Sequence, residues 1–435
     1  MLKPSPAYSH LAAATDEAVM PPIFQAPLSR LWGRTVEIAN FHIPRVIPKG
    51  EGKFLIQYRF STVDEHGHQP RIFFGRLLSP SEMIPAYAKE PNAFFVANIR
   101  LVVPVFPFDP KIKTLAQFFD PAPGPGLLQP LTQTLGLNGT AQVVKVDVLG
   151  YRLERRGILN ISVSEHGRTL SLVAKLVRSE KAAGLFEQLR TLEENGFGAS
   201  SKENIRVPHP VTATSEGVLW LEAIADSSLH DLIETERFIP GCRSAGLALQ
   251  KLHSAKLQNL SLYTIEEALS ELKDLAFETA RIYPALQENV HEVWKKLESS
   301  RPAMEEKEFA PLHRDFYDKQ LLAGSNRTTL LDTDALSRGD PAQDVGNFLA
   351  HLILRGKQHS LPEKIVGQAR TNFLEAYHPS KSPMTGKNFQ KRTTWWEAAS
   401  LLRLACLYSL RPRWKKLAIP LLEQSKKTPR GESNA

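Results

Sequence analysis

Cysteine is scarce in this chain, whose 435 residues include only Cys242 and Cys406. Two cysteines so far apart predict neither a disulfide framework nor a cysteine-rich zinc site. The sequence also lacks an uninterrupted run of about 18 apolar residues, the length a membrane-spanning helix needs. Its first residues contain no long apolar stretch behind a basic start, so no secretory signal is expected. Together these features predict a soluble protein of the cytoplasm.

The overall composition is that of a globular protein. Apolar residues make up 42% of the chain and charged residues 23%, and the length suffices for two or three domains. The formal net charge is +8, and basic residues are densest at 411–416. We interpret that segment as a solvated helix face rather than a nucleic-acid site. The sequence therefore predicts neither a nucleic-acid partner nor a membrane partner.

The pattern of residues changes along the chain and predicts an α+β fold. Residues 1–29, rich in Ala, Pro and Ser, are expected to form a flexible lead-in. Strand-like patterns fill 30–125 and 140–226, with a Pro- and Gly-rich boundary between them. Helical spacing dominates 227–425. Strands followed by helices are typical of α+β domains rather than of a doubly wound sheet.

Two predicted hairpins, at 54–78 and 158–177, resemble each other. Both turn at Glu-His-Gly, and each is followed downstream by Asn-Ile-Arg. We interpret the pattern as a duplicated β-rich small lobe, with chance similarity as the alternative. In this alignment Arg76 falls at the position of Lys175. Because an arginine fork does not replace a lysine at a tight phosphate site without rearrangement, the first lobe is expected to bind no nucleotide.

The residues that indicate chemistry lie between 311 and 344. Asp315 follows His313 by two positions, Gln320 follows five positions later, and Asp332 ends an apolar, strand-like run. Phosphoryl transfer requires one carboxylate that accepts the proton of the attacking hydroxyl group. It also requires a carboxylate and an amide oxygen that hold magnesium. The pattern predicts Asp315 as the catalytic base, with Gln320 and Asp332 as metal ligands.

The same segment resembles the aminoglycoside phosphotransferase and choline kinase superfamily. The matching elements are His313-Arg-Asp315, Asp332 after its apolar run, and Gly339-Asp-Pro-Ala-Gln-Asp344. The likeness is clear over 140–350 and strongest over 311–346. The family commonly has Asn where this chain has Gln320, a variant shared with maltokinase-like members. The resemblance implies a two-lobed, protein-kinase-like fold, here with an additional N-terminal β-rich lobe. It also implies that His313, Asp334 and Asp344 support the site.

The nucleotide side of the site is identified through the same resemblance. Val173-Ala-Lys175 resembles the strand lysine that pairs with nucleotide phosphates. Among the glutamates of the next helix, Glu187 is the expected partner of this lysine, with a surface glutamate as the alternative. The adenine is expected at the backbone of Glu222 and Ala223. The chain lacks Asp-Phe-Gly, Ala-Pro-Glu and a glycine-dense phosphate loop, which argues against a protein kinase.

These features predict an ATP- and magnesium-dependent enzyme that phosphorylates a hydroxyl group of a small molecule, a sugar or an amino alcohol. The alternative is a non-catalytic, kinase-like protein that binds a nucleotide or a partner. The presence of Lys175, Asp315 and Asp332 favours the enzyme. No cluster of residues is diagnostic of the acceptor substrate.

Overall fold

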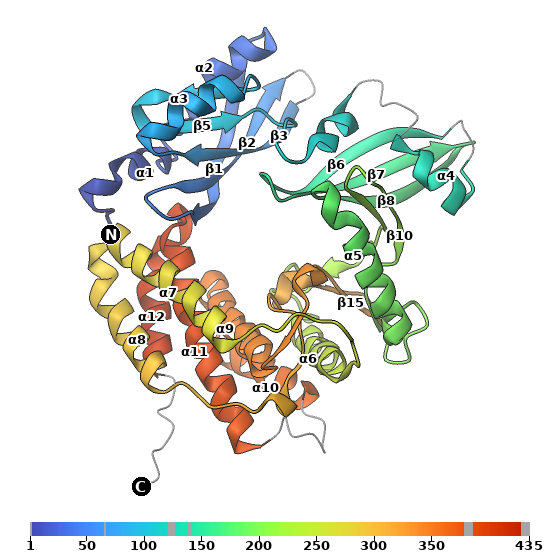
Figure 1. Ribbon diagram of the computed structural model, residues 1–435, viewed down its shortest axis with the longest axis vertical. Coiled ribbons are helices and arrows are strands. Elements are labelled where there is room, and N and C mark those ends of the chain that lie inside the picture. The colour runs from blue at the N-terminus through green and yellow to red at the C-terminus, as the bar shows by residue number, and fades with distance from the viewer. Residues whose placement is uncertain (1, 65–66, 121–126, 138–140, 378–385, 428–435) are drawn as a thin grey trace.

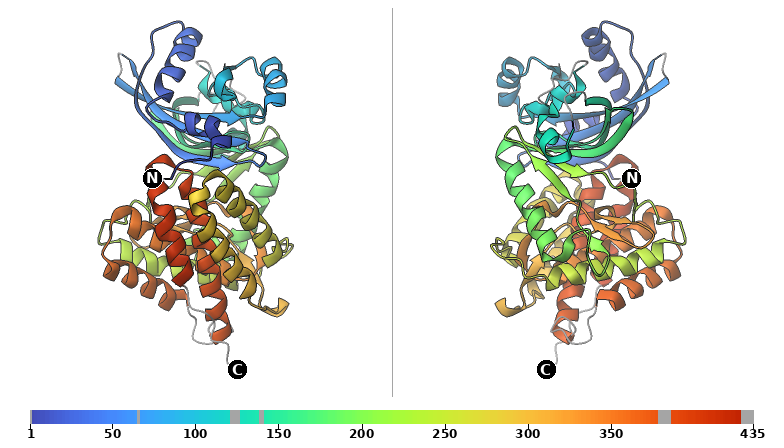
Figure 2. Two further views of the ribbon diagram at one scale, coloured as in Figure 1. Left: turned by 90° about the vertical axis from the view of Figure 1, so that its left-hand side faces the viewer. Right: turned by 90° about the vertical axis from the view of Figure 1, so that its right-hand side faces the viewer.

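A computed structural model shows three parts of the chain arranged around a common centre (Figure 1). Two sheets lie above a group of helices, and α5 extends from the second sheet toward the helices (Figures 1 and 2). Within the part of the chain that the structure describes, no helix is both long enough and apolar enough to span a bilayer. The structure describes residues 2–64, 67–120, 127–137, 141–377 and 386–427.

The first 29 residues do not form a flexible lead-in, and this prediction was wrong. They form α1 (Ser9–Ala14) and most of α2 (Met20–Trp32). Phe24 is completely buried, and its ring lies 4.7 Å from that of Tyr58 in the first sheet. Met20, Phe24 and Leu28 recur at helical spacing, so the apolar period identifies the helix although the composition suggests a loose segment.

The first sheet is antiparallel throughout and has the strand order β1-β2-β3-β5-β4. Helix α3 (Pro80–Lys89) lies in the chain between its third and fourth strands. The predicted hairpin at 54–78 is confirmed as β2 and β3. The strands are β1 (Glu37–Pro48), β2 (Phe54–Asp64), β3 (Gly67–Leu77), β4 (Ala93–Val96) and β5 (Leu101–Pro104).

The second sheet repeats this arrangement. Its order is β6-β7-β8-β11-β10, all antiparallel, and α5 (Ser179–Leu192) follows its third strand. When the strands of each sheet are numbered by their order in the chain, both sheets place them side by side as first, second, third, fifth and fourth. The hairpin predicted at 158–177 is confirmed as β7 and β8. The strands are β6 (Gln142–Arg152), β7 (Arg156–Glu165), β8 (Arg168–Leu176), β10 (Pro210–Ala213) and β11 (Val218–Glu222).

The registers of the two sheets place Arg76 and Lys175 at corresponding points. Arg76 pairs with a residue of the second strand and one of the fifth, Leu55 and Val102. Lys175 pairs with the equivalent strands at Ile158 and Leu219.

The two Asn-Ile-Arg segments do not correspond, and their use as repeats was wrong. Residues 98–100 lie between the fourth and fifth strands of their sheet, whereas 204–206 precede β10, the fourth strand of the other. The correspondence between the sheets therefore depends on strand order and register alone. The first of the two Glu-His-Gly turns lies partly outside the described residues.

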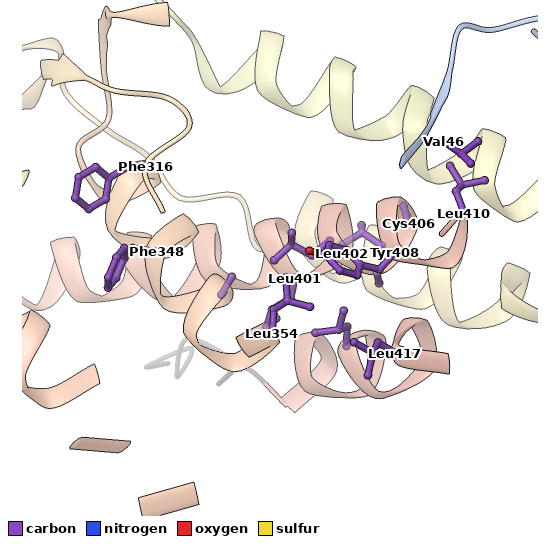
Figure 3. Packing of buried hydrophobic residues seen from close by; sticks show 14 of the residues in the cluster. Val46, Phe316, Phe348, Leu354, Leu401, Leu402, Cys406, Tyr408, Leu410 and Leu417 are labelled. Atoms are coloured by element: carbon purple, nitrogen blue, oxygen red, sulfur yellow. The ribbon is translucent and has the colours of Figure 1, made fainter. Parts of the chain in front are cut away.

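The first sheet is attached to both other parts of the molecule. Phe74 packs edge-on against Tyr151 of β6, with ring centres 5.4 Å apart, inside an apolar cluster that both sheets share. Val46 of β1 lies beside Leu410 of the helical lobe (Figure 3). The extra sheet is thus fixed against the second sheet and the helical lobe by buried apolar contacts.

The helical lobe is built on α9 and α11, which pack closely because Gly346 leaves room. A Cβ at that position would lie 2.6 Å from the backbone nitrogen of Glu397. The larger helices of this lobe are α6 (Phe238–Ser254), α7 (Ile265–Ile282), α8 (Gln287–Ser299), α9 (Ala342–His359), α10 (Glu363–Tyr377), α11 (Lys387–Ser409) and α12 (Ala418–Lys427). A further short helix, α4 (Gln129–Leu135), precedes the second sheet.

Short strands in the helical lobe present the predicted catalytic segment. One pair comprises β13 and β16, and a four-stranded sheet has the order β12-β14-β15-β9. The segment 313–320 connects β13 to β14, and Asp332 lies two residues after the end of β15. These strands are β9 (Ile205–Arg206), β12 (Ser227–Ser228), β13 (Ala310–Leu312), β14 (Leu321–Ala323), β15 (Thr328–Leu330) and β16 (Ser337–Gly339).

Candidate active site

The loop after β13 is fixed by buried hydrogen bonds. The carboxylate of Asp344, on the first turn of α9, accepts bonds from the backbone N–H groups of His313 (2.7 Å) and Arg314 (2.9 Å). His313 is fully buried, and its Nε2 lies 2.8 Å from the carbonyl oxygen of Leu331. Arg314 adopts a left-handed backbone conformation (φ 67°), a strained arrangement that persists where surrounding contacts enforce it.

Asp315 projects from this fixed loop with its side chain 48% exposed, although the adjacent Phe316 is fully buried. One carboxylate oxygen lies 3.9 Å from Nη2 of Arg403 on α11. Arg403 is itself held by a 3.1 Å hydrogen bond to the side-chain oxygen of Asn347. A solvent-accessible carboxylate on a rigid loop is the arrangement that a general base requires.

Gln320 and Asp332 lie together. The Gln320 side-chain amide is 3.5 Å from a carboxylate oxygen of Asp332, which has a left-handed backbone (φ 55°). Burial alone would raise the pKa of Asp332, but the positive charges of Lys175 and Arg156 outweigh it and lower the pKa to about 2. Asp332 is therefore an anion at neutral pH, as a metal ligand must be.

Gln320 and Asp332 supply some, but not all, of the ligands that a magnesium ion needs. Among the described residues no group of three or more His, Cys, Asp or Glu side chains is arranged to hold a metal ion. Magnesium usually binds proteins through one or two carboxylates and takes its other ligands from substrate phosphates and water. The Asp332 carboxylate and the Gln320 amide match the small number of protein ligands that such a magnesium site uses.

Lys175 joins the second sheet to this acidic segment. Its ammonium group donates a hydrogen bond to Asp334 and lies 3.7 Å from Asp332. Arg156, at the start of β7, also donates a hydrogen bond to Asp332. Arg156 was not among the predicted site residues, whereas the structure places it beside Asp332. No local pattern marks this role, because the contact joins residues from different lobes.

Glu187 does not pair with Lys175 in the structure, contrary to expectation. It is exposed on α5, and no carboxylate on that helix forms an ion pair with Lys175 within the described ranges. The residue of α5 that faces the site is Gln188, whose amide donates a hydrogen bond to the carbonyl oxygen of Thr333. Helical spacing contains this signal, since position 187 lies opposite the apolar face and position 188 at its border.

Glu222 and Ala223 lie where β11 leaves the second sheet. The Glu222 carboxylate is engaged by Arg206 (2.7 Å) and by the backbone N–H of His209 (2.7 Å), so it holds the connection to the helical lobe. Ala223 follows in an irregular segment, and its backbone makes no hydrogen bond with another described residue. Its N–H and carbonyl group are the candidates for contact with an adenine.

Asp318, which was not among the predicted site residues, supports the loop from within the helical lobe. It is almost completely buried and lies 3.0 Å from Arg355 and 2.6 Å from Nδ1 of His230. Although burial would raise its pKa, the charge of Arg355 and the contact with His230 hold the pKa well below its usual range. Asp318 therefore anchors the loop from beneath, between Asp315 and Gln320.

A small pocket lies in the helical lobe next to the loop that carries Asp315, and Arg314 of that loop lines it. Its volume is about 240 Å³, and Arg314, Arg403 and Asn347 connect it to the catalytic segment. Its walls come from α7, α9 and α11 and include Tyr263, Ala268, Glu271, Leu272, Leu275, Gln343, Trp396, Ala399, Ser400 and Leu407.

Comparisons with known proteins find one matching family model and several distantly similar solved structures. A family model described as "Phosphotransferase enzyme family" matches residues 163–386, just over half of the 435 residues. Among solved structures, spectinomycin phosphotransferase in complex with ADP and spectinomycin is 12% identical, with 70% of this chain and 97% of that chain covered and a TM-score of 0.46. Choline kinase from Cryptosporidium parvum Iowa II is 10% identical, with 70% and 94% covered and a TM-score of 0.48.

Amicoumacin kinase, in complex with AMP-PNP, Ca²⁺ and Ami, is 12% identical, with 73% of this chain and 96% of that chain covered and a TM-score of 0.45. A search of curated proteins finds no match. Identities and scores this low carry no inference about the substrate of this chain.

The family match and the α+β architecture identify a kinase-like phosphotransferase fold, preceded here by an extra sheet. The chain belongs to the phosphotransferase enzyme family, and it is an ATP-dependent small-molecule kinase.

Proposed function

We propose that the chain transfers the terminal phosphoryl group of ATP to a hydroxyl group of a small molecule, with Asp315 as the catalytic base. The observation that carries this proposal is the convergence of Lys175, from the second sheet, with Gln320 and Asp332, from the helical lobe. Asp332 lies 3.7 Å from Lys175 and 3.5 Å from the Gln320 amide. Asp315 accepts the proton of the acceptor hydroxyl group as the oxygen attacks phosphorus.

Other residues hold the nucleotide. Lys175 and Arg156 place positive charge where the phosphates are expected, and the backbone of Ala223 binds the adenine. Gln320 and Asp332 hold magnesium, which when bound neutralises charge on the phosphates. His313, Asp334 and Asp344 keep these groups in place, and on α5 it is Gln188 rather than Glu187 that contacts this segment.

The pocket beside Asp315 is the proposed acceptor site, and its charge favours a sugar over an amino alcohol. Arg314 and Arg403 both line it, against a single lining carboxylate, Glu271, which lies 3.8 Å from Arg314. A cationic acceptor would meet two like charges beside the catalytic aspartate. Tyr263 and Trp396 add flat apolar walls of the kind that pack against small ligands.

We further propose that the lobe at 30–125 is a duplicate of the small lobe at 140–226, and that 227–425 forms the large lobe. The identical strand order and the equivalent registers of Arg76 and Lys175 support this. Arg76 is bound to Glu90 and Glu154, so its charge is neutralised within the protein. The first lobe is therefore expected to bind no nucleotide.

The test is ADP production by the full-length protein, measured with and without magnesium on a panel of sugars and amino alcohols. Magnesium-dependent ADP release that requires an acceptor would support the proposal. ATP binding with no turnover on any acceptor would instead support the alternative, a non-catalytic binding protein.

A further inference from the structure

A second pocket lies between the two small lobes, away from Asp315. Its volume is about 520 Å³. It is bordered by the turn between β1 and β2, by the end of β3, by the turn between β6 and β7, and by the start of α5. Its lining residues are Lys49, Lys53, Phe54, Leu55, Arg76, Leu77, Leu78, Lys111, Leu153, Glu154, Arg155, Arg178 and Lys181.

This lining is strongly cationic, with seven lysines and arginines against one carboxylate. The carboxylate, Glu154, is already paired with Arg76 (3.1 Å) and Lys111 (3.0 Å). Four lining cations form no ion pair with any residue that the structure describes: Lys49, Arg155, Arg178 and Lys181. Partial burial and the nearby charges of Arg152 and Arg155 lower the pKa of Lys49. The positive charges are therefore close enough to repel one another.

The pocket lies at the edge of the first sheet that corresponds to the side of the second sheet where the nucleotide phosphates are expected. Arg76 occupies the register of Lys175, and the β1–β2 turn corresponds to the turn that carries Arg156. This turn, Lys49-Gly-Glu-Gly-Lys53, is closed by a 2.9 Å hydrogen bond from the Lys49 N–H to the Lys53 carbonyl oxygen. Gly50 and Gly52 both have positive φ values, 76° and 72°, which bring two lysines to one end of the hairpin.

We propose that this pocket binds a small molecule that carries two or more phosphate groups. Separate cations on five chain segments suit a ligand with several anionic groups, and the volume is that of a metabolite site. Phe54, Leu55 and Leu153 supply an apolar wall. The ligand is not a magnesium nucleotide, because the only lining carboxylate is engaged by two cations and the lining offers no second oxygen donor from an amide side chain.

Binding here would act on the catalytic centre through one turn. Glu154 and Arg155 line the pocket, and the next residue, Arg156, donates a hydrogen bond to Asp332. A ligand that draws Arg155 toward the pocket shifts this turn. If the proposed function holds, occupancy of the pocket changes the KM for ATP. This consequence rests on the proposed function, whereas the binding itself does not.

The experiment uses isothermal titration calorimetry of inorganic tripolyphosphate into the full-length chain without magnesium. All proteins carry Lys175→Met, which disables the candidate nucleotide site. The test protein adds Lys49→Gln and Lys181→Gln. A matched control adds Lys364→Gln and Lys391→Gln instead, two exposed lysines of the helical lobe that remove the same charge. Circular dichroism verifies that all three proteins are folded.

We expect the Lys175→Met protein and the control to bind tripolyphosphate equally, and the test protein to bind about tenfold more weakly or worse, since it loses two charge-assisted contacts. Equal affinities in test and control proteins, or no binding to the Lys175→Met protein, would overturn the proposal. Binding only to vesicles that contain a bisphosphorylated inositol lipid would also overturn it, because the ligand would then be a lipid headgroup. Since no transfer is measured, failure of the proposed enzyme activity leaves this result interpretable.

Discussion

The ammonium group of Lys175 lies 3.7 Å from the carboxylate of Asp332, although the second sheet carries one residue and the helical lobe the other. Lys175 also donates a hydrogen bond to Asp334. A lysine of the small lobe is thus oriented by carboxylates of the large lobe. Any change that separates the lobes must also move this charge away from the expected position of the phosphates.

Helix α5 is expected to position this contact through Gln188 rather than Glu187. Gln188→Ala removes the hydrogen bond to the Thr333 carbonyl group, beside Asp332, and should raise the KM for ATP about fivefold, the equivalent of one hydrogen bond. Glu187→Gln is the control, since that side chain is exposed, and should leave the KM unchanged. Steady-state kinetics with varied ATP checks both. A larger effect from the Glu187 variant would restore the original assignment.

The sequence allowed the main features of the site to be predicted because they are encoded locally. Asp315, Gln320 and Asp332 stand at fixed spacings within one segment, and both hairpins have alternating strand patterns with a turn between them. The fold class follows from the order of strands and helices. Such patterns depend on neighbours in the chain, which a single sequence displays directly.

The features that the sequence did not reveal depend on contacts between distant segments. Arg156 meets Asp332 only because the lobes are packed together, and Asp318 is buried only because Arg355 of α9 lies beneath it. Helix α2 was missed because its composition outweighed its apolar period. The Asn-Ile-Arg segments misled because a tripeptide recurs by chance, whereas strand order and register do not.

Asp315→Asn is expected to abolish transfer while leaving ATP binding largely intact. The side chain is half exposed and does not contact Lys175, so its loss removes the base but not the nucleotide contacts. The rate should fall by about 10² to 10⁴. Turnover measured with saturating acceptor checks the rate, and calorimetry checks the affinity for ATP. Asp274→Asn on the exposed side of α7 is the control, and wild-type turnover in the Asp315 variant would exclude the assigned role.

Asp332→Ala should remove the magnesium dependence of ATP binding. The residue supplies the carboxylate of the proposed metal pair and also receives the charges of Lys175 and Arg156. ATP affinity should be similar with and without magnesium in this variant, whereas in the parent protein magnesium strengthens binding. Calorimetric titrations in both conditions make the comparison. An unchanged response to magnesium would mean that the metal ligand lies elsewhere.

Asp318→Ala is expected to destabilise the fold rather than to alter the chemistry directly. It leaves Arg355 buried without its partner, a loss of about 3–5 kcal/mol in the free energy of unfolding at neutral pH. The pKa of Asp318 is depressed in the folded state, so its stabilisation is present above the unfolded value of about 3.9 and is lost as pH falls toward the folded pKa. The stability difference between parent and variant should therefore shrink below about pH 4.

Urea unfolding at several pH values measures this difference. Glu234→Ala serves as the control, because Glu234 also contacts a histidine, His359 at 2.8 Å, but is 70% exposed. Its loss should change the free energy of unfolding by less than about 1 kcal/mol. Similar losses in the two variants would show that Asp318 is not an anchor of the loop.

The charge beside Asp315 predicts how the enzyme ranks its acceptors. D-glucose and D-glucosamine form a matched pair, since they differ in one group that is cationic in the second. Arg314 and Arg403 line the acceptor pocket, so we expect the KM to be lower for glucose than for glucosamine, by about tenfold at partly solvated separations.

Arg403→Gln should reduce the ratio of the KM for glucosamine to the KM for glucose, because it removes one of the two like charges. Arg243→Gln, an exposed arginine on α6, should leave it unchanged. Because Arg403 also lies 3.9 Å from Asp315, we expect its substitution to alter kcat for both sugars. The ratio of the two KM values is therefore the quantity that reports on acceptor charge. A lower KM for glucosamine in the parent protein would reverse the assignment and favour an amino alcohol.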